Sequence, residues 1–152
     1  MIKVFSFINS SANELPMLHT VYLGLGSNLG NRRSIMKEAI SRISEKIGEV
    51  VRQSSFIETE PWGFDSPNMF LNACVCVETE QTPRQLLVAT QQIEKNMGRA
   101  HKTTDDEYQD RIIDIDILLY DNLKINEPDL KIPHPLMEER DFVMIPLKEI
   151  LE

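Results

Sequence analysis

The order of helical and strand-like segments restricts the fold of this chain more than any other feature of its sequence. Apolar side chains recur at helical spacing in the first third of the chain, at Ile35, Ala39, Ile40, Ile43 and Ile47. The sequence TPRQ predicts that a second helix begins at Thr82 and runs to Met97, because it supplies an N-cap, a helix-starting proline and a capping box. Strands are predicted at 20–26, 49–58 and 70–78, in RIIDIDILLY and, after a short helical MEER, in FVMIPL.

This order, approximately β-α-β-β-α-β, predicts a ferredoxin-like α+β fold: one antiparallel sheet with helices packed on its faces, in a single domain. Residues 1–18 are polar and aperiodic, so we expect an N-terminal extension and then the domain at 19–152, with Met17 as a candidate natural start. No apolar run approaches the ~20 residues of a membrane span, and polar residues follow VFSFI too early for a secretion signal. We therefore expect a cytoplasmic protein with no membrane partner.

The net charge of −8 argues against a nucleic-acid partner, because contacts with nucleic-acid phosphates need a basic surface. A phosphate ligand would have to be bound by a local basic cluster or through metal ions. Cys74 and Cys76 are the two cysteines of the chain, and no further ligands stand at the spacing of a zinc site. They are expected to be reduced thiols in the core.

Asp114 and Asp116 interrupt an apolar, β-branched run. Residues two apart on a strand share a face about 7 Å apart, so their carboxylates repel each other. A solvated strand face and a site for divalent cations both explain this pattern, and D-x-D is too short to decide between them. Basic residues accompany the pair in the sequence, namely Arg99, His101, Lys102 and Arg111. Their presence favours metal-assisted phosphoryl transfer, in which catalysis depends on neutralising phosphate charge.

The few aromatic residues either pack in the core or hold a flat ligand. Phe70 begins one predicted strand, Phe142 begins another, and Asn72 shares a strand face with Phe70. Two rings and an amide in this arrangement would suit the two faces and the edge of a heterocycle. The turn GLGSNLG lacks the spacing of a dinucleotide-binding loop, and no P-loop motif is present, so a nucleotide would be held in another way.

Six separated motifs occur in an order and spacing typical of one enzyme family: LGLGSNLGNR, TEPWG, FLNACV, QIEKNMGR, RIIDIDIL and IPHPLMEERDFVMIPL. Over about residues 20–150 the chain resembles 6-hydroxymethyl-7,8-dihydropterin pyrophosphokinase of folate biosynthesis. The resemblance implies that pyrophosphate is transferred from ATP to the hydroxymethyl group of the pterin, with release of AMP, by an enzyme able to work as a monomer.

The resemblance also implies roles for individual residues. Asp114 and Asp116 would bind two Mg²⁺ ions between the ATP phosphates, and with Arg99 and Arg111 they would form the catalytic set. The pterin would be bound by Thr59, Phe70, Asn72 and Phe142. The nucleotide would be bound by Gln91, Glu94, Arg99, His101, Arg111, His134 and Arg140.

Two other functions remain open at this point. A nucleotidyltransferase with a D-x-D pair would also use two metal ions but would release pyrophosphate, and the paired rings with Asn72 argue against it. A ferredoxin-like regulatory module would bind a small ligand without catalysis, and it would not need two aspartates and two arginines together. Replacing Asp116 with alanine separates an enzyme from such a module, because it should abolish catalysis while the fold survives.

Overall fold

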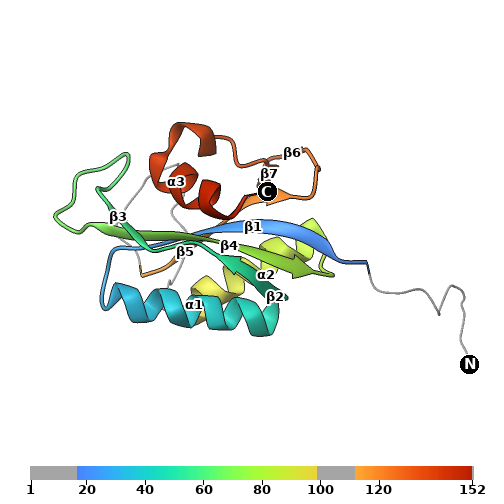
Figure 1. Ribbon diagram of the computed structural model, residues 1–152, viewed down its shortest axis with the longest axis horizontal. Helices are drawn as coiled ribbons and strands as arrows, with labels where there is room; N and C mark the ends of the chain where they lie inside the picture. Colours follow the sequence, from blue (N-terminus) through green and yellow to red (C-terminus); the bar gives the residue numbers. More distant parts are fainter. Residues whose placement is uncertain (1–16, 99–111, 152) are drawn as a thin grey trace, which may run out of the picture.

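The computed structural model describes residues 17–98 and 112–151, which form an antiparallel sheet with helices on both faces (Figure 1). Its strands are β1 (His19–Ser27), β2 (Glu49–Gln53), β3 (Ile57–Thr59), β4 (Phe70–Thr79) and β5 (Asp114–Tyr120). The spatial order is β2-β4-β1-β5, and β3 also pairs with β4. This is the strand order expected of a ferredoxin-like sheet, so the predicted α+β fold is confirmed.

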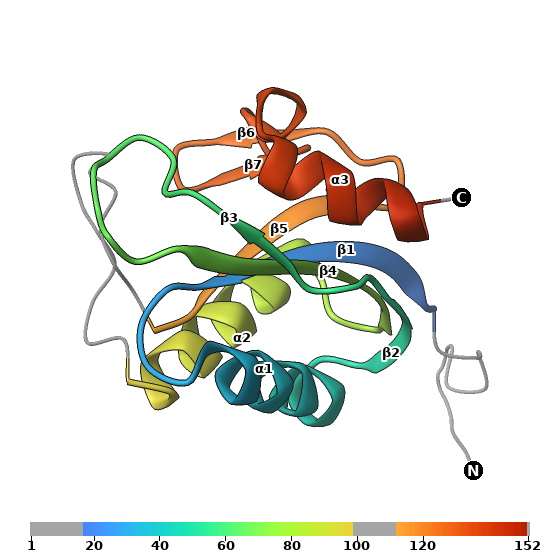
Figure 2. The same ribbon diagram turned by 60° about the vertical axis from the view of Figure 1, so that its left-hand side comes forward.

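Two helices cover one face of the sheet and a third covers the other (Figures 1 and 2). α1 (Arg32–Lys46) and α2 (Pro83–Asn96) lie together below the sheet in Figure 1, and α3 (Asp141–Ile150) lies above it. The capping box predicted at Thr82 is present at the start of α2. Among the described helices, none is long and apolar enough to cross a membrane.

A small hairpin protects the edge of the sheet at β5. It consists of β6 (Ile125–Glu127) and β7 (Leu130–Ile132), and a single turn of 3-10 helix, η1 (Met137–Glu139), follows it. Just after β7, the backbone N–H of His134 donates to the carbonyl of Leu118 in β5 at 3.0 Å. Because an uncovered edge strand exposes unpaired backbone groups, this contact satisfies one of them and ties the segment that carries His134 to β5.

Alternation along the central strands divides the core into two layers. Val21, Leu23 and Leu25 of β1 point towards α1 and α2, where they join the larger apolar cluster. Tyr22 of β1 and both cysteines of β4 point the other way, into the cluster under α3. Cys74 and Cys76 are therefore buried free thiols, as expected.

The strand predicted at 49–58 is divided into β2 and β3 by residues 54–56. At the break, the N–H of Cys74 donates to the side-chain hydroxyl of Ser54 at 2.8 Å. The N–H of Ser54 in turn donates to the carbonyl of Cys74 at 2.9 Å. A serine side chain thus replaces a backbone acceptor in the ladder, a substitution that strand propensity does not reveal.

The prediction of a strand in FVMIPL was wrong, because this segment forms α3. The buried positions of the helix are Val143, Pro146, Leu147 and Ile150, which follow the i, i+3, i+4, i+7 spacing of an α-helix. In a continuous apolar run this period cannot be distinguished from that of a buried strand. The segment packs on the face of the sheet that carries Cys74 and Cys76. Only a helix buries these four side chains together against that face.

Glu149 of α3 anchors the helix to the segment between β2 and β3. Its carboxylate accepts hydrogen bonds from the backbone N–H of Ser55 at 2.8 Å and from the Ser55 hydroxyl at 2.7 Å. These bonds, the backbone one first, lower the pKa of Glu149 from its ordinary value of 4.5. A carboxyl group with a lowered folded-state pKa adds stability above its unfolded-state pKa, and the added stability is lost as the pH falls through the folded-state value.

We therefore expect Glu149→Gln to lower the melting temperature at neutral pH but to have little effect once the pH lies below the folded-state pKa, where the wild-type carboxyl is also protonated. Circular dichroism melts of both proteins across this pH range measure the difference. Glu45→Gln, at an exposed position of α1, is the control, and it should leave the melting temperature unchanged at neutral and at acidic pH. An equal loss for Glu149→Gln at every pH would show that the carboxylate charge does not matter.

Candidate functional site

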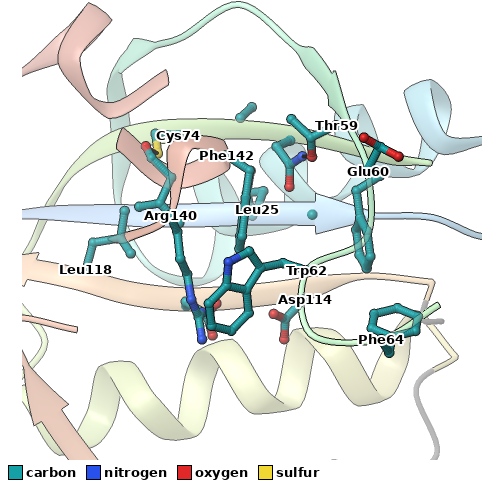
Figure 3. A pocket seen from close by; sticks show the side chains of 17 residues that line it. Leu25, Thr59, Glu60, Trp62, Phe64, Cys74, Asp114, Leu118, Arg140 and Phe142 are labelled. Atoms are coloured by element: carbon teal, nitrogen blue, oxygen red, sulfur yellow. Dashed lines mark hydrogen bonds between the residues drawn. The ribbon is translucent and has the colours of Figure 1, made fainter. Parts of the chain in front are cut away.

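A pocket that is open at one side lies on the α3 face of the sheet (Figure 3). Its floor comes from β1, β4 and β5, and its walls come from the β3–β4 loop and the start of α3. Seven of the residues expected at the site line this one pocket: Thr59, Phe70, Asn72, Asp114, Asp116, Arg140 and Phe142. The fold therefore gathers two rings, an amide, a guanidinium and both carboxylates from four separate parts of the chain.

Two glycines of β1 make room for the pocket. Gly24 pairs with Cys74 on one side and Asp116 on the other, and Gly26 lies between Asn72 and Asp114. A Cβ atom on Gly26 would lie 3.1 Å from Oδ1 of Asn72. The sequence placed these glycines at the end of the strand predicted at 20–26, and they were not identified as site residues. Glycine at alternate positions inside a predicted strand was the available signal, since it often marks a close approach of a ligand.

The side of the pocket next to β3 is built around Asn72. This side chain is buried, and its Nδ2 donates to the Thr59 hydroxyl at 2.6 Å. The bond fixes the orientation of the amide, whose Oδ1 faces Gly26. Phe64 of the β3–β4 loop packs edge-on against Phe70, with ring centroids 6.2 Å apart. An oriented amide beside supported aromatic rings can recognise the edge and the face of a flat heterocycle.

The two aspartates lie on one face of β5, as their spacing predicted, and both are half-buried. Asp116 also lines a second, shallower groove on the far side of β5, together with Gln91 and His134. The pocket and the groove therefore meet at Asp116. A ligand in the groove and a ligand in the pocket would both lie next to Asp116.

The carboxylates of Asp114 and Asp116 suit a hard divalent cation. Across residues 17–98 and 112–151, no three His, Cys, Asp or Glu side chains gather as a set of metal ligands. This part of the protein thus offers two carboxylates to a cation near β5. Mg²⁺ is commonly held by one or two carboxylates together with substrate phosphates, so these residues fit it.

The resemblance assigned two further residues to the nucleotide, and neither of them lines the groove beside β5. Glu94 is only 2% exposed, and its Oε2 accepts a hydrogen bond from the backbone N–H of Ile115 in β5 at 2.7 Å. It therefore joins α2 to the strand that carries the aspartates. Arg140 lies in the pocket, with its guanidinium over the rings of Trp62 and Phe142.

The remaining members of the expected site include residues that the structure does not describe. Arg99, His101 and Arg111 lie outside the described residues.

Cys74 lies in the pocket wall, where burial, more than the nearby carboxylates of Glu149 and Asp116, raises its pKa to about 12. Its thiol stays protonated at neutral pH, so it acts as part of the wall and not as a nucleophile.

Comparison with known proteins identifies one family. Residues 22–152 match the sequence model of 7,8-dihydro-6-hydroxymethylpterin-pyrophosphokinase (HPPK). Bacterial proteins named 2-amino-4-hydroxy-6-hydroxymethyldihydropteridine pyrophosphokinase are similar over most of this chain. The protein of Porphyromonas gingivalis is 47% identical over 86% of this chain and 89% of its own length. That of Bacillus subtilis is 38% identical over 90% of this chain and 80% of its own length.

Solved structures agree on the fold. The crystal structure of wild-type Plasmodium falciparum HPPK-DHPS with pteroate superposes with a TM-score of 0.67 at 18% identity. The match covers 90% of this chain and 39% of that longer chain. At this identity the likeness supports the architecture, and the sequence relatives carry the assignment to the family.

Proposed function

The chain belongs to the 7,8-dihydro-6-hydroxymethylpterin-pyrophosphokinase family, and from this premise we propose how its residues share the reaction. It is an ATP-dependent enzyme that transfers pyrophosphate from ATP to hydroxymethyldihydropterin in folate synthesis. The observation that carries the proposal is the junction at Asp116, where an aromatic pocket and an open groove meet.

In this proposal the pterin occupies the pocket. Phe70 and Phe142 lie against its two faces, and Asn72 with Thr59 binds its polar edge. The supporting observations are the hydrogen bond that orients the amide and the space left by Gly24 and Gly26. Such a site, mostly apolar with a few placed polar groups, is typical for a small heterocycle.

ATP occupies the groove, with its polyphosphate directed towards Asp116. Gln91 and His134 line the groove and contact the nucleotide, while Arg140 meets the phosphates from the pocket side. Arg99, His101 and Arg111 are proposed as further nucleotide contacts on the strength of their motifs. Glu94 contributes by holding β5 in place through Ile115. This arrangement brings the nucleotide and the acceptor to opposite sides of one carboxylate.

Asp114 and Asp116 are proposed to hold two Mg²⁺ ions. Bound Mg²⁺ neutralises charge on the polyphosphate and orients it. The two carboxylates would hold the ions, and the pocket and the groove would place the hydroxymethyl oxygen of the pterin opposite the β-phosphorus of ATP. The new bond forms between these two atoms, and the bond from the β-phosphorus to the oxygen of AMP breaks. Catalysis is mostly positioning and charge neutralisation, as expected for phosphoryl transfer.

We also propose that the enzyme acts as a cytoplasmic monomer. This proposal carries over the monomer expected from the family resemblance. Size-exclusion chromatography with light scattering, at the concentration used for assays, tests the oligomeric state. A dimer mass at that concentration would contradict the proposal.

Product identity tests the reaction itself. The purified protein is incubated with ATP, Mg²⁺ and 6-hydroxymethyl-7,8-dihydropterin, and the nucleotides are separated by chromatography. AMP that forms only in the presence of the pterin is the expected product. Formation of ADP would indicate transfer of a single phosphoryl group, and release of free pyrophosphate would indicate nucleotidyl transfer.

Gly26→Ala tests the place of the pterin. The new Cβ would lie 3.1 Å from Oδ1 of Asn72, so this amide must shift, and 3.5 Å from Cδ1 of Phe70, which is an ordinary contact that fills space in the pocket. We expect the dissociation constant for the pterin to rise about tenfold or more, with little effect on that for an ATP analogue. Calorimetric titration measures both constants. Equal affinity of the variant and wild type for the pterin would place the acceptor elsewhere.

A further inference from the structure

Arg140 is a buried cation whose guanidinium lies against two aromatic rings. Its side chain is only 5% exposed, although it carries a full positive charge. The guanidinium carbon lies 4.4 Å from the centroid of the Trp62 ring and 5.7 Å from that of Phe142. Removing a guanidinium from water is costly unless other groups compensate, and the faces of aromatic rings attract cations. Trp62 therefore helps to keep Arg140 in the pocket.

The two aromatic side chains of the β3–β4 loop have different partners. Phe64 packs against Phe70, which is proposed to contact the pterin. Trp62 lies at the rim of the pocket, 37% exposed, with its indole against the guanidinium of Arg140 (Figure 3). The same loop thus supports the acceptor side through one ring and the cationic side through the other.

We propose that Trp62 is a positioning residue, which holds the Arg140 guanidinium where the polyphosphate of ATP meets Asp114 and Asp116. Trp62 acts on the nucleotide through Arg140, so a loop that borders the pterin pocket affects how ATP is oriented. This inference rests on the proposed placement of ATP beside Asp116. In addition to bordering the pterin, the β3–β4 loop then positions the guanidinium that contacts ATP.

A double-mutant cycle between Trp62→Leu and Arg140→Met tests the proposal. We expect Trp62→Leu alone to lower kcat/KM for ATP about tenfold, and Trp62→Phe, which keeps an aromatic face, to restore most of the loss. In the Arg140→Met background, Trp62→Leu should have almost no further effect on that constant. An equal loss in both backgrounds would overturn the proposal, because Trp62 would then act independently of Arg140.

Phe64→Leu is the matched control, since Phe64 belongs to the same loop and borders the same pocket. Its effect should multiply with that of Arg140→Met, because its partner is Phe70. If Arg140→Met does not fold, Arg140→Lys takes its place in the cycle. Lysine keeps the charge but lacks the planar guanidinium that stacks on an indole.

Intrinsic fluorescence gives a direct readout, because Trp62 is the one tryptophan of the chain. Binding of a non-hydrolysable ATP analogue with Mg²⁺ should change its emission in the wild type and should not do so in Arg140→Met at saturating analogue. An identical change in both proteins would overturn the coupling. The result of this titration tests only the coupling between Trp62 and Arg140. The proposed placement of ATP in the groove and of the pterin in the pocket would instead fail if Asp116→Ala kept its turnover.

Discussion

Asp116→Ala is expected to lower kcat about a thousandfold or more while the protein stays folded. The carboxylate lies where the pocket and the groove meet, so its removal takes away a ligand for the cation at the point of transfer. A steady-state assay of AMP formation at saturating ATP, pterin and Mg²⁺ measures the loss. Chelation of Mg²⁺ in the wild-type protein should have the same result.

Folding of the variant is checked by its melting temperature without metal. Asp114 and Asp116 repel each other across one strand face, so removing one charge should not lower that temperature. Asp116→Asn keeps the shape of the side chain and should be equally inactive, since a neutral amide binds Mg²⁺ poorly. Glu45→Ala, at an exposed position of α1, is the control for a lost carboxylate and should keep full activity. Near-normal turnover by Asp116→Ala would contradict the metal role and favour a binding module.

Gly48→Ala should have the largest effect on stability. Gly48 lies between α1 and β2, and a Cβ atom there would stand 2.0 Å from the carbonyl oxygen of Glu78 in β4. Because this atom belongs to a backbone in the middle of the sheet, it cannot move aside as the end of a side chain can. We expect a loss of about 3 kcal/mol or more in the free energy of unfolding. Urea denaturation followed by circular dichroism measures it.

Gly24→Ala is the comparison for stability. A Cβ atom on Gly24 would lie 3.4 Å from Cδ1 of Leu118, an ordinary contact with a side chain that can adjust. Its stability should therefore remain much closer to that of the wild type. A similar loss in both variants would mean that glycine flexibility, and not the close approach to Glu78, makes Gly48 necessary.

The elements that the sequence predicted correctly depend on neighbouring residues. Helix α1 follows from apolar side chains at i, i+4 and i+8, and α2 follows from the capping box at Thr82. The common face of Asp114 and Asp116 follows from strand geometry alone. In each case the signal lies within a few residues, because backbone hydrogen bonding sets both the period and the caps.

FVMIPL shows where such reasoning stops. The run is apolar at every position, so it contains no polar residues to mark an exposed face. The helical spacing of Val143, Leu147 and Ile150 becomes visible only when they pack on the face of the sheet that carries Cys74 and Cys76. Burial of these side chains selects the helix, and burial is a property of the assembled layers.

By itself the sequence determined the ferredoxin-like order of elements, the carboxylate pair and the resemblance that led to the pyrophosphokinase family. Only the tertiary structure decided that Gly24 and Gly26 form the floor of the pocket, that Glu94 supports β5, and that Trp62 stacks on Arg140. Each of these contacts joins segments that are distant along the chain. No local period records them, because they arise when strands, loops and helices with separate local preferences pack against one another.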